Sequence, residues 1–75
     1  MSVASDKVIA IGKTYFGPAT ESFLSRQCKS HLKMELKDLT PADLKTLANW
    51  VEVGAGLIMD QAKAAEVARK IAAIV

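Results

Sequence analysis

The stretch Thr40-Pro41-Ala42-Asp43 constrains the fold of this 75-residue chain more than any other. A threonine can cap the start of a helix, proline suits the first helical position, and an acidic residue three places after the cap completes a capping box. Leu39 before the cap and Leu44 after it have the spacing of a hydrophobic staple. These features predict a helix that starts near Pro41.

The residues that follow repeat apolar side chains at the period of an α-helix. The predicted core stripe consists of Leu44, Leu47, Ala48, Val51 and Ala55. Gly54 and Gly56 lie at the end of this stripe. Because each glycine in a helix costs roughly 1 kcal/mol relative to alanine, the pair predicts either a break in the helix or close backbone packing.

Two more helices are predicted before this one. Ser5 and Asp6 favour a helix start, and apolar residues at spacings of three and four continue to Phe16. Gly17-Pro18 ends that helix and begins a second one, which reaches about Lys33. The apolar face expected for this second helix consists of Ala19, Phe23, Leu24, Gln27, Cys28, His31 and Leu32.

A last helix is predicted at the end of the sequence. Asp60 is a suitable cap, and the helix extends to about Ala73. Its expected apolar stripe consists of Ala64, Ala65, Ala68, Ile71, Ala72 and Val75. The alanines would allow a neighbouring helix to approach closely.

Taken together, these elements indicate an all-α fold. Residues 8–11 would also suit a short strand, but the sequence offers no second strand to pair with it. We therefore expect a single domain over residues 1–75, a compact bundle of three or four short helices. The expected helix starts lie near Ser5, Pro18, Pro41 and Asp60.

The composition of the chain bears on its partners and on its cellular compartment. The formal net charge of +2 is too small to imply nucleic-acid or membrane binding by itself. Cys28 is the only cysteine, which excludes a disulfide within the chain and favours a reducing compartment. The longest uncharged apolar run, residues 53–59, is far shorter than the ~20 residues of a membrane helix. Since no basic segment followed by an apolar run opens the sequence, we expect a cytoplasmic protein without a signal peptide.

The sequence Gly12-Lys13-Thr14 matches the end of a phosphate-binding P-loop. That loop also needs a glycine five residues earlier, because its backbone amides wrap the phosphates. Lys7 occupies this position, and the chain offers no sheet to hold such a loop. The stretch is therefore interpreted as part of a helix with an exposed lysine.

Cys28 and His31 are the one pair with metal-ligand character. Two ligands are too few for a structural zinc site, and Cys28 falls on an apolar stripe where a free cysteine usually packs as a small hydrophobe. A metal-responsive or redox-responsive role of the pair remains an alternative. The carboxylates suit caps and solvated faces rather than an acid–base pair, so we expect no enzymatic activity, no cofactor and no bound metal.

A basic group lies between residues 26 and 37. Its members are Arg26, Lys29, Lys33 and Lys37, with His31 between them. Only Glu35 opposes these charges inside the span. The group supports an alternative function as a nucleic-acid-binding helical domain.

The sequence carries more apolar side chains than one core stripe can bury, and this surplus favours a different function. Trp50 lies beside the Leu44–Val51 stripe rather than on it, and Val53 and Leu57 extend this second face. At the end of the chain, Ile74 and Val75 do not both fit one core face. Large exposed apolar patches mark interfaces, so these five residues predict contact with another protein or with a second copy of the chain.

A short pattern carries a family resemblance. The stretch Tyr15-Phe16-Gly17-Pro18-Ala19 opens an amphipathic helix, and Leu44-Lys45-Thr46-Leu47-Ala48 begins a later one. This arrangement resembles small helical modules at the C-terminal ends of some bacterial signalling proteins, including certain Ser/Thr protein kinases. The resemblance implies an accessory or interaction module, and it brings no catalytic residues.

Overall fold

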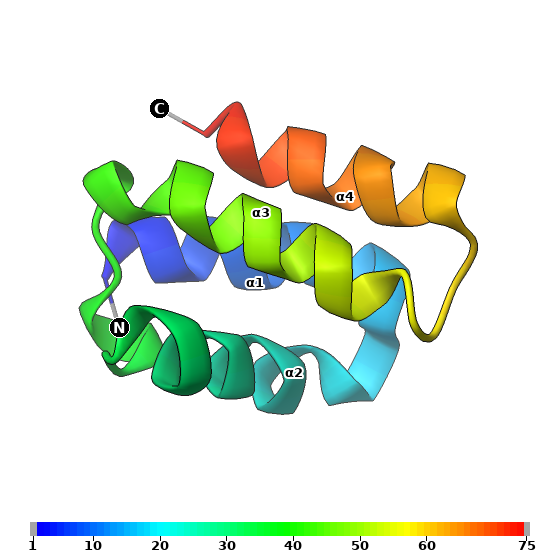
Figure 1. Ribbon diagram of the computed structural model, residues 1–75. Helices are drawn as coiled ribbons and strands as arrows, with labels where there is room; N and C mark the ends of the chain where they lie inside the picture. Colours follow the sequence, from blue (N-terminus) through cyan, green and yellow to red (C-terminus); the bar gives the residue numbers. More distant parts are fainter. Residues whose placement is uncertain (1, 75) are drawn as a thin grey trace.

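The computed structural model describes residues 2–74 and shows an all-α protein, as predicted (Figure 1). Its α-helices are α1 (Val3–Phe16), α2 (Thr20–Gln27), α3 (Leu44–Ala55) and α4 (Gln61–Ala72). Shorter helical turns join them: the 3₁₀ turns η1 (Gly17–Ala19), η3 (Leu36–Asp38) and η4 (Pro41–Asp43), and the π-helical turn η2 (Cys28–Leu32).

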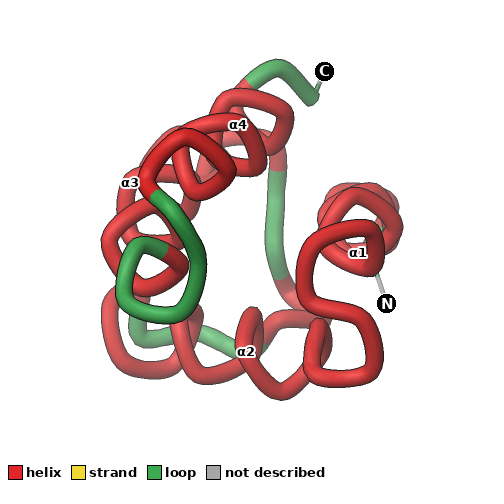
Figure 2. The backbone as a smooth tube through the Cα atoms, turned by 90° about the vertical axis from the view of Figure 1, so that its right-hand side faces the viewer, coloured by secondary structure: helices red, strands yellow, loops and turns green. Residues whose placement is uncertain are grey.

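The four α-helices are arranged in chain order around a central core, and consecutive helices run antiparallel (Figures 1 and 2). α4 returns to contact α1, which closes the ring. The side chains that fill the core come from all four helices and from the segment between α2 and α3. Fully buried members include Val8, Leu24, Leu39, Leu44, Leu47, Val51, Val67 and Ile71.

The first helix begins at Val3 rather than near Ser5, so the predicted start was wrong by two residues. Ser2 is the cap: its hydroxyl oxygen accepts a hydrogen bond from the Ser5 amide at 3.0 Å. The same hydroxyl donates to the carbonyl of Leu39 at 2.6 Å. A serine that also binds the distant α2–α3 connection makes the better cap, and Ser5 is then buried inside the helix.

The corner between α1 and α2 is built on two glycines. Gly17 adopts a φ of 59°, a region that L-residues rarely occupy, and it turns the chain. At Gly12, a Cβ methyl group would lie 2.6 Å from Cγ2 of Thr20, so only glycine allows this approach. Phe16 stacks on Phe23 with ring centroids 4.4 Å apart, which joins the two helices.

The expected face of α2 needs correction at both ends. Ala19 is exposed and Thr20 is buried in its place, because the turn η1 precedes the helix and shifts its register. At the other end, the π-turn η2 is wider than an α-helical turn. His31 is therefore exposed rather than on the buried face, whereas Cys28 is fully buried.

The predictions for α3 are confirmed: every residue of its core stripe is buried. The backbone amide of Thr40 donates to the Asp43 carboxylate at 3.0 Å, and its hydroxyl donates to the same oxygen at 2.8 Å. The first turn after this cap is 3₁₀, so the α-helix itself starts at Leu44. It ends at Ala55, with Gly56 as the C-cap.

Asp60 caps α4 as predicted, since its carboxylate accepts from the Lys63 amide at 2.9 Å. The predicted stripe of this helix was wrong in part. Val67 is fully buried, whereas Ala72 is exposed and Ala65 only half-buried. Val75, also assigned to the stripe, lies outside the described residues.

Candidate protein-interaction surface

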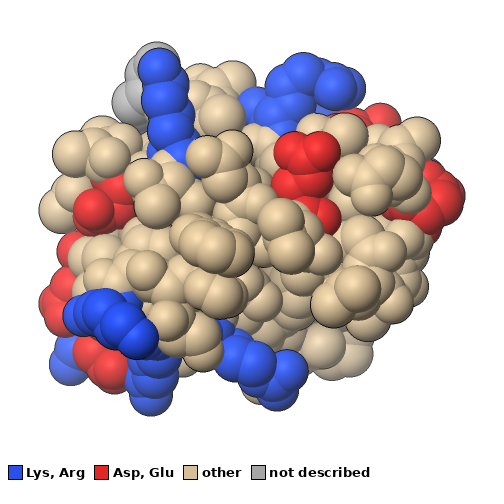
Figure 3. Space-filling model, in the orientation of Figure 1, with Lys and Arg blue, Asp and Glu red and all other residues tan. Residues whose placement is uncertain are grey.

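Large apolar side chains are exposed over one short segment of the chain. Trp50 is 37% exposed, Val53 61%, Leu57 85% and Ile58 66%; we call these four residues the apolar face. Figure 3 shows a broad uncharged surface across α3 and α2, with Lys, Arg, Asp and Glu side chains mainly toward its margins. The remaining large apolar side chain that the described residues expose is Val3, on α1.

α3 carries this face because it has two apolar sides. Its core stripe points into the bundle, while Trp50 and Val53 lie three residues apart on the outer side. After the helix ends, the amide of Leu57 donates to the carbonyl of Gly54 at 3.2 Å. The amide of Ile58 donates to the carbonyl of Ala55 at 3.0 Å. These bonds hold a tight turn from which the last two apolar side chains project.

A groove of about 360 Å³ lies beside Leu57 and Ile58, between α2 and α3. Its other lining residues are Ala19, Ser22, Phe23, Arg26, Gln27 and Gly54. A methyl group at Gly54 would lie 2.9 Å from Nε2 of Gln27 and 3.1 Å from Cζ of Phe23. Of the two predicted alternatives, close packing thus applies at Gly54, and α3 also ends next to it, at Ala55.

Gln27 is a polar residue in the wall of this groove. Its side chain is 9% exposed, and its amide oxygen is buried without a hydrogen-bond partner among residues 2–74. An unsatisfied buried acceptor costs about 1–3 kcal/mol. The contact region between α2 and α3 is thus locally less stable than an apolar wall would be.

Trp50 is held in place by an aromatic stack. The His31 ring lies parallel to the indole, with centroids 3.9 Å apart and an interplanar angle of 4°. The stack covers part of the indole on the η2 side and leaves the rest exposed. This pairing could not be predicted from the sequence, because the two residues belong to elements that only the tertiary structure brings together.

Three of the predicted contact residues, Trp50, Val53 and Leu57, are exposed. Ile58 joins them and was missed as a candidate, although its position in the apolar run 53–59 was a usable signal. Ile74 packs against the core after α4 and is half-buried. Val75 lies outside the described residues.

The predicted basic group is distributed over several elements. Arg26 lies on α2, Lys29 in η2, Lys33 directly after η2 and Lys37 in η3. Lys29 pairs with Glu35 at 3.6 Å, and the ammonium of Lys33 donates to the carbonyl of Ser30 at 3.2 Å. Exposed pairs of this kind are weak, so these two contacts neutralise little of the positive charge of the group.

Cys28 and His31 do not form a joint site. The thiol of Cys28 is buried in the core, and burial, followed by the charge of Asp43, raises its pKa. His31 is exposed and stacks on Trp50. In the part of the chain that the structure describes, no three His, Cys, Asp or Glu side chains gather closely enough to hold a metal ion.

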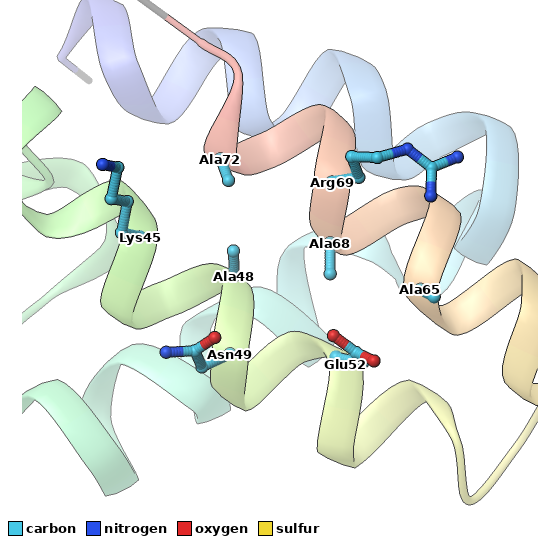
Figure 4. Close-up of a pocket in the computed structure, with 8 residues that line it drawn as sticks. All are labelled: Lys45, Ala48, Asn49, Glu52, Ala65, Ala68, Arg69 and Ala72. Atoms are coloured by element: carbon cyan, nitrogen blue, oxygen red, sulfur yellow. The ribbon is translucent and has the colours of Figure 1, made fainter.

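A second concave surface lies between α3 and α4. It has a volume of about 500 Å³, and Figure 4 shows short alanine side chains between the two helices with longer polar side chains around them. The lining residues are Lys45, Ala48, Asn49, Glu52, Ala65, Ala68, Arg69 and Ala72. The alanines let α3 and α4 pack closely, and charged side chains line the edge of this groove.

A polar network links α1 to α4 on another side of the bundle. The Tyr15 hydroxyl donates a hydrogen bond to the carboxylate of Glu66. The Lys70 ammonium lies 3.9 Å from the same carboxylate and 5.2 Å from the centre of the Tyr15 ring. The hydrogen bond from Tyr15, and then the nearby cations, lower the pKa of Glu66.

None of the helices within residues 2–74 combines the length and the apolar character that crossing a membrane would require. Comparisons of the chain with protein-family models, with curated proteins and with solved structures find no match. The functional assignment must therefore come from the geometry and chemistry of the molecule itself.

Proposed function

We propose that this chain is a non-enzymatic protein–protein interaction module of the bacterial cytoplasm, and that it binds its partner through the apolar face. The observation that carries the proposal is the clustering of four large exposed apolar side chains within residues 50–58. Monomeric proteins rarely expose contiguous apolar patches larger than a few hundred Å².

The energetics of burial support this role. Covering a fully exposed Leu or Ile side chain is worth about 1.5–3 kcal/mol, and Leu57 is 85% exposed. Trp50 is of a residue type enriched among the dominant contacts of interfaces. Because His31 already restricts its ring, binding would cost less side-chain entropy.

The surroundings of the apolar face also suit a protein partner. Interface centres are depleted in charge and are ringed by polar residues, and the uncharged surface across α2 and α3 has this arrangement (Figure 3). The adjacent groove offers a recess for an apolar side chain. An interaction role also agrees with the resemblance to helical modules of bacterial signalling proteins.

Nucleic-acid binding through Arg26, Lys29, Lys33 and Lys37 stays the alternative prediction. No single observation favours it over the apolar face, since these cations are spread over α2, η2 and η3. A mobility shift that weakens steeply with salt, because counterions are released from phosphates, would support the alternative.

A comparative pull-down from the native cytoplasm tests the proposed function. The bait is either the wild-type chain or the double variant Val53→Glu/Leu57→Glu, which places charge on the apolar face without touching the core. Val3→Glu is the matched control, because Val3 is exposed and apolar but lies elsewhere. We expect partners that are lost with the double variant and kept with the control; identical capture by all three baits would contradict the proposal.

A further inference from the structure

We propose that the stack of His31 on Trp50 is a pH-sensitive contact that sets how firmly Trp50 is held at the protein surface. Protonation of His31 tightens the stack, and loss of the proton loosens it. The consequence for binding rests on the proposed function, because Trp50 belongs to the apolar face. The inference adds a regulation of that surface.

The two rings have the geometry that makes protonation matter. The imidazole lies parallel to the indole, with ring centroids 3.9 Å apart and an interplanar angle of 4°. A cation within about 6 Å of the centre of an aromatic ring is attracted by the ring electrons, and tryptophan gives the strongest attraction. A neutral imidazole lacks this attraction and keeps the stacking contact alone. Protonation of His31 therefore strengthens the contact without a rearrangement of the rings.

The backbone on both sides of the stack is fixed. Trp50 lies in the middle of α3. The turn η2 is anchored by Cys28, which is fully buried, and by Leu32, which packs against the core. After the turn, the amide of Lys33 donates to the carbonyl of Cys28. A change in the charge of His31 therefore acts on the two side chains rather than on the helical segments that carry them.

The stack is open to the solvent. His31 is exposed, and Trp50 is partly so. Histidine is the side chain whose charge ordinarily changes at pH values between about 5 and 8. Because an exposed imidazole exchanges its proton directly with water, the contact can respond to the pH of its surroundings.

Charged groups of both signs surround the stack. Within and after η2, Lys29 pairs with Glu35 at 3.6 Å, and the ammonium of Lys33 donates to the carbonyl of Ser30. Charged residues on the neighbouring elements are Glu21 and Arg26 on α2, Lys37 and Asp38 in η3, Asp43 in η4, and Lys45 and Glu52 on α3. Surface charges are screened by solvent and salt, whereas the indole contacts the imidazole directly. The pH response is therefore assigned to the contact with Trp50.

The proposed response has a consequence for binding. A tightened stack fixes the indole in its position before a partner arrives. A contact residue that is already fixed loses less conformational freedom on association. The partner of the apolar face should therefore bind more tightly when His31 is protonated.

Acrylamide quenching of Trp50 fluorescence in the isolated chain tests the proposal. The chain has one tryptophan and one histidine, so the emission and the imidazole charge each belong to one residue. A cation over an exposed ring shifts the equilibrium toward the stacked indole by about 2- to 5-fold. We therefore expect a quenching constant at about pH 5.5 that is lower by up to ~5-fold than at about pH 8. An equal or higher constant at the lower pH would overturn the proposal.

Two variants separate the charge of His31 from its shape. His31→Phe keeps a stacking ring that cannot take up a proton, so its quenching should be the same at both pH values. His31→Arg carries a planar cation at both pH values, so its indole should stay as protected as in the wild type in acid. Because His31 is exposed, neither variant alters the core. A pH dependence that persists in His31→Phe would belong to another group and overturn the proposal.

The quenching experiment needs no partner, so the two proposals fail separately. The absence of a pH response would overturn the regulation and leave the outcome of the pull-down unchanged. Identical capture by all three baits would contradict the proposed function, while a pH-dependent stack would still be established for the isolated chain.

Discussion

At the scale of single residues, this fold depends on places where a side chain must be absent. Gly12 lets α1 approach Thr20, and Gly54 lets α3 approach Gln27 and Phe23. Helix propensity alone would favour alanine at both positions. The close contacts show that packing, rather than propensity, selects glycine here.

The variant Gly12→Ala tests this conclusion. The added methyl would lie 2.6 Å from Cγ2 of Thr20, so we expect a loss of about 1–3 kcal/mol in the free energy of unfolding from overpacking. Urea denaturation measures this loss. The double variant Gly12→Ala/Thr20→Ser removes the clashing methyl and keeps the hydroxyl bonded to the Gly17 carbonyl, so it should recover most of the stability; failure to recover would place the strain elsewhere.

At Gln27, in contrast to Gly12, we expect a substitution that does not lower the stability. Because its buried amide oxygen lacks a partner among the described residues, Gln27→Met should leave the free energy of unfolding unchanged or raise it by up to ~1 kcal/mol. Gln61→Met is the control, since Gln61 is exposed and its replacement should have little effect. A clear loss of stability in Gln27→Met alone, seen as a lower urea midpoint, would contradict the unsatisfied state of the amide.

At the scale of helices, neighbouring elements are joined by specific side-chain contacts as well as by the core. The stack of Phe16 on Phe23 joins α1 to α2, and the hydrogen bond from Tyr15 to Glu66 joins α1 to α4. The second contact is pH-dependent, because an ionised carboxylate accepts a stronger hydrogen bond than a protonated carboxyl group does. It therefore offers a direct measure of how α4 is held against α1.

Tyr15→Phe should change the pH dependence of stability. The hydrogen bond lowers the pKa of Glu66 below its ordinary value of 4.5, so its contribution is present above pH 4.5 and is lost as the pH falls through the lowered pKa. We expect the wild type to be more stable than Tyr15→Phe at neutral pH, with the difference shrinking in acid. In the Glu66→Gln background, thermal unfolding of the same pair should show a difference that no longer depends on pH over this range.

At the scale of the whole molecule, a small ring of helices leaves one side incompletely covered. The core is filled from all four α-helices, yet the outer side of α3 still exposes Trp50 and Val53. Binding to this side would link folding to association, because a partner that binds only the folded state stabilises it.

If the apolar face binds a second copy of the chain, one of the two kinds of partner that the sequence predicts, the Tm should depend on concentration. Raising the wild-type concentration from about 5 to 500 µM should raise the Tm by several degrees, since mass action favours the folded dimer. Val53→Glu/Leu57→Glu should unfold at a Tm that does not change with concentration, whereas Val3→Glu should follow the wild type. A wild-type Tm that is constant over this range would argue against self-association.

Local chemistry made much of the fold predictable from the sequence. The caps at Thr40 and Asp60 and the core stripe of α3 were identified correctly, because capping bonds and helical periodicity act between residues close together in the chain. The same local reasoning predicted that Trp50, Val53 and Leu57 would lie off the core stripe.

The features of the fold that local reasoning did not predict depend on contacts between residues far apart in the chain. Ser2 caps α1 while it binds Leu39, and the π-turn η2 places His31 against Trp50. By itself the sequence determined an all-α chain of three or four helices, the caps at Thr40 and Asp60 and a surplus of apolar side chains. Only the tertiary structure decided which of those side chains remain exposed together, because exposure depends on how neighbouring helices pack and not on the spacing within one helix.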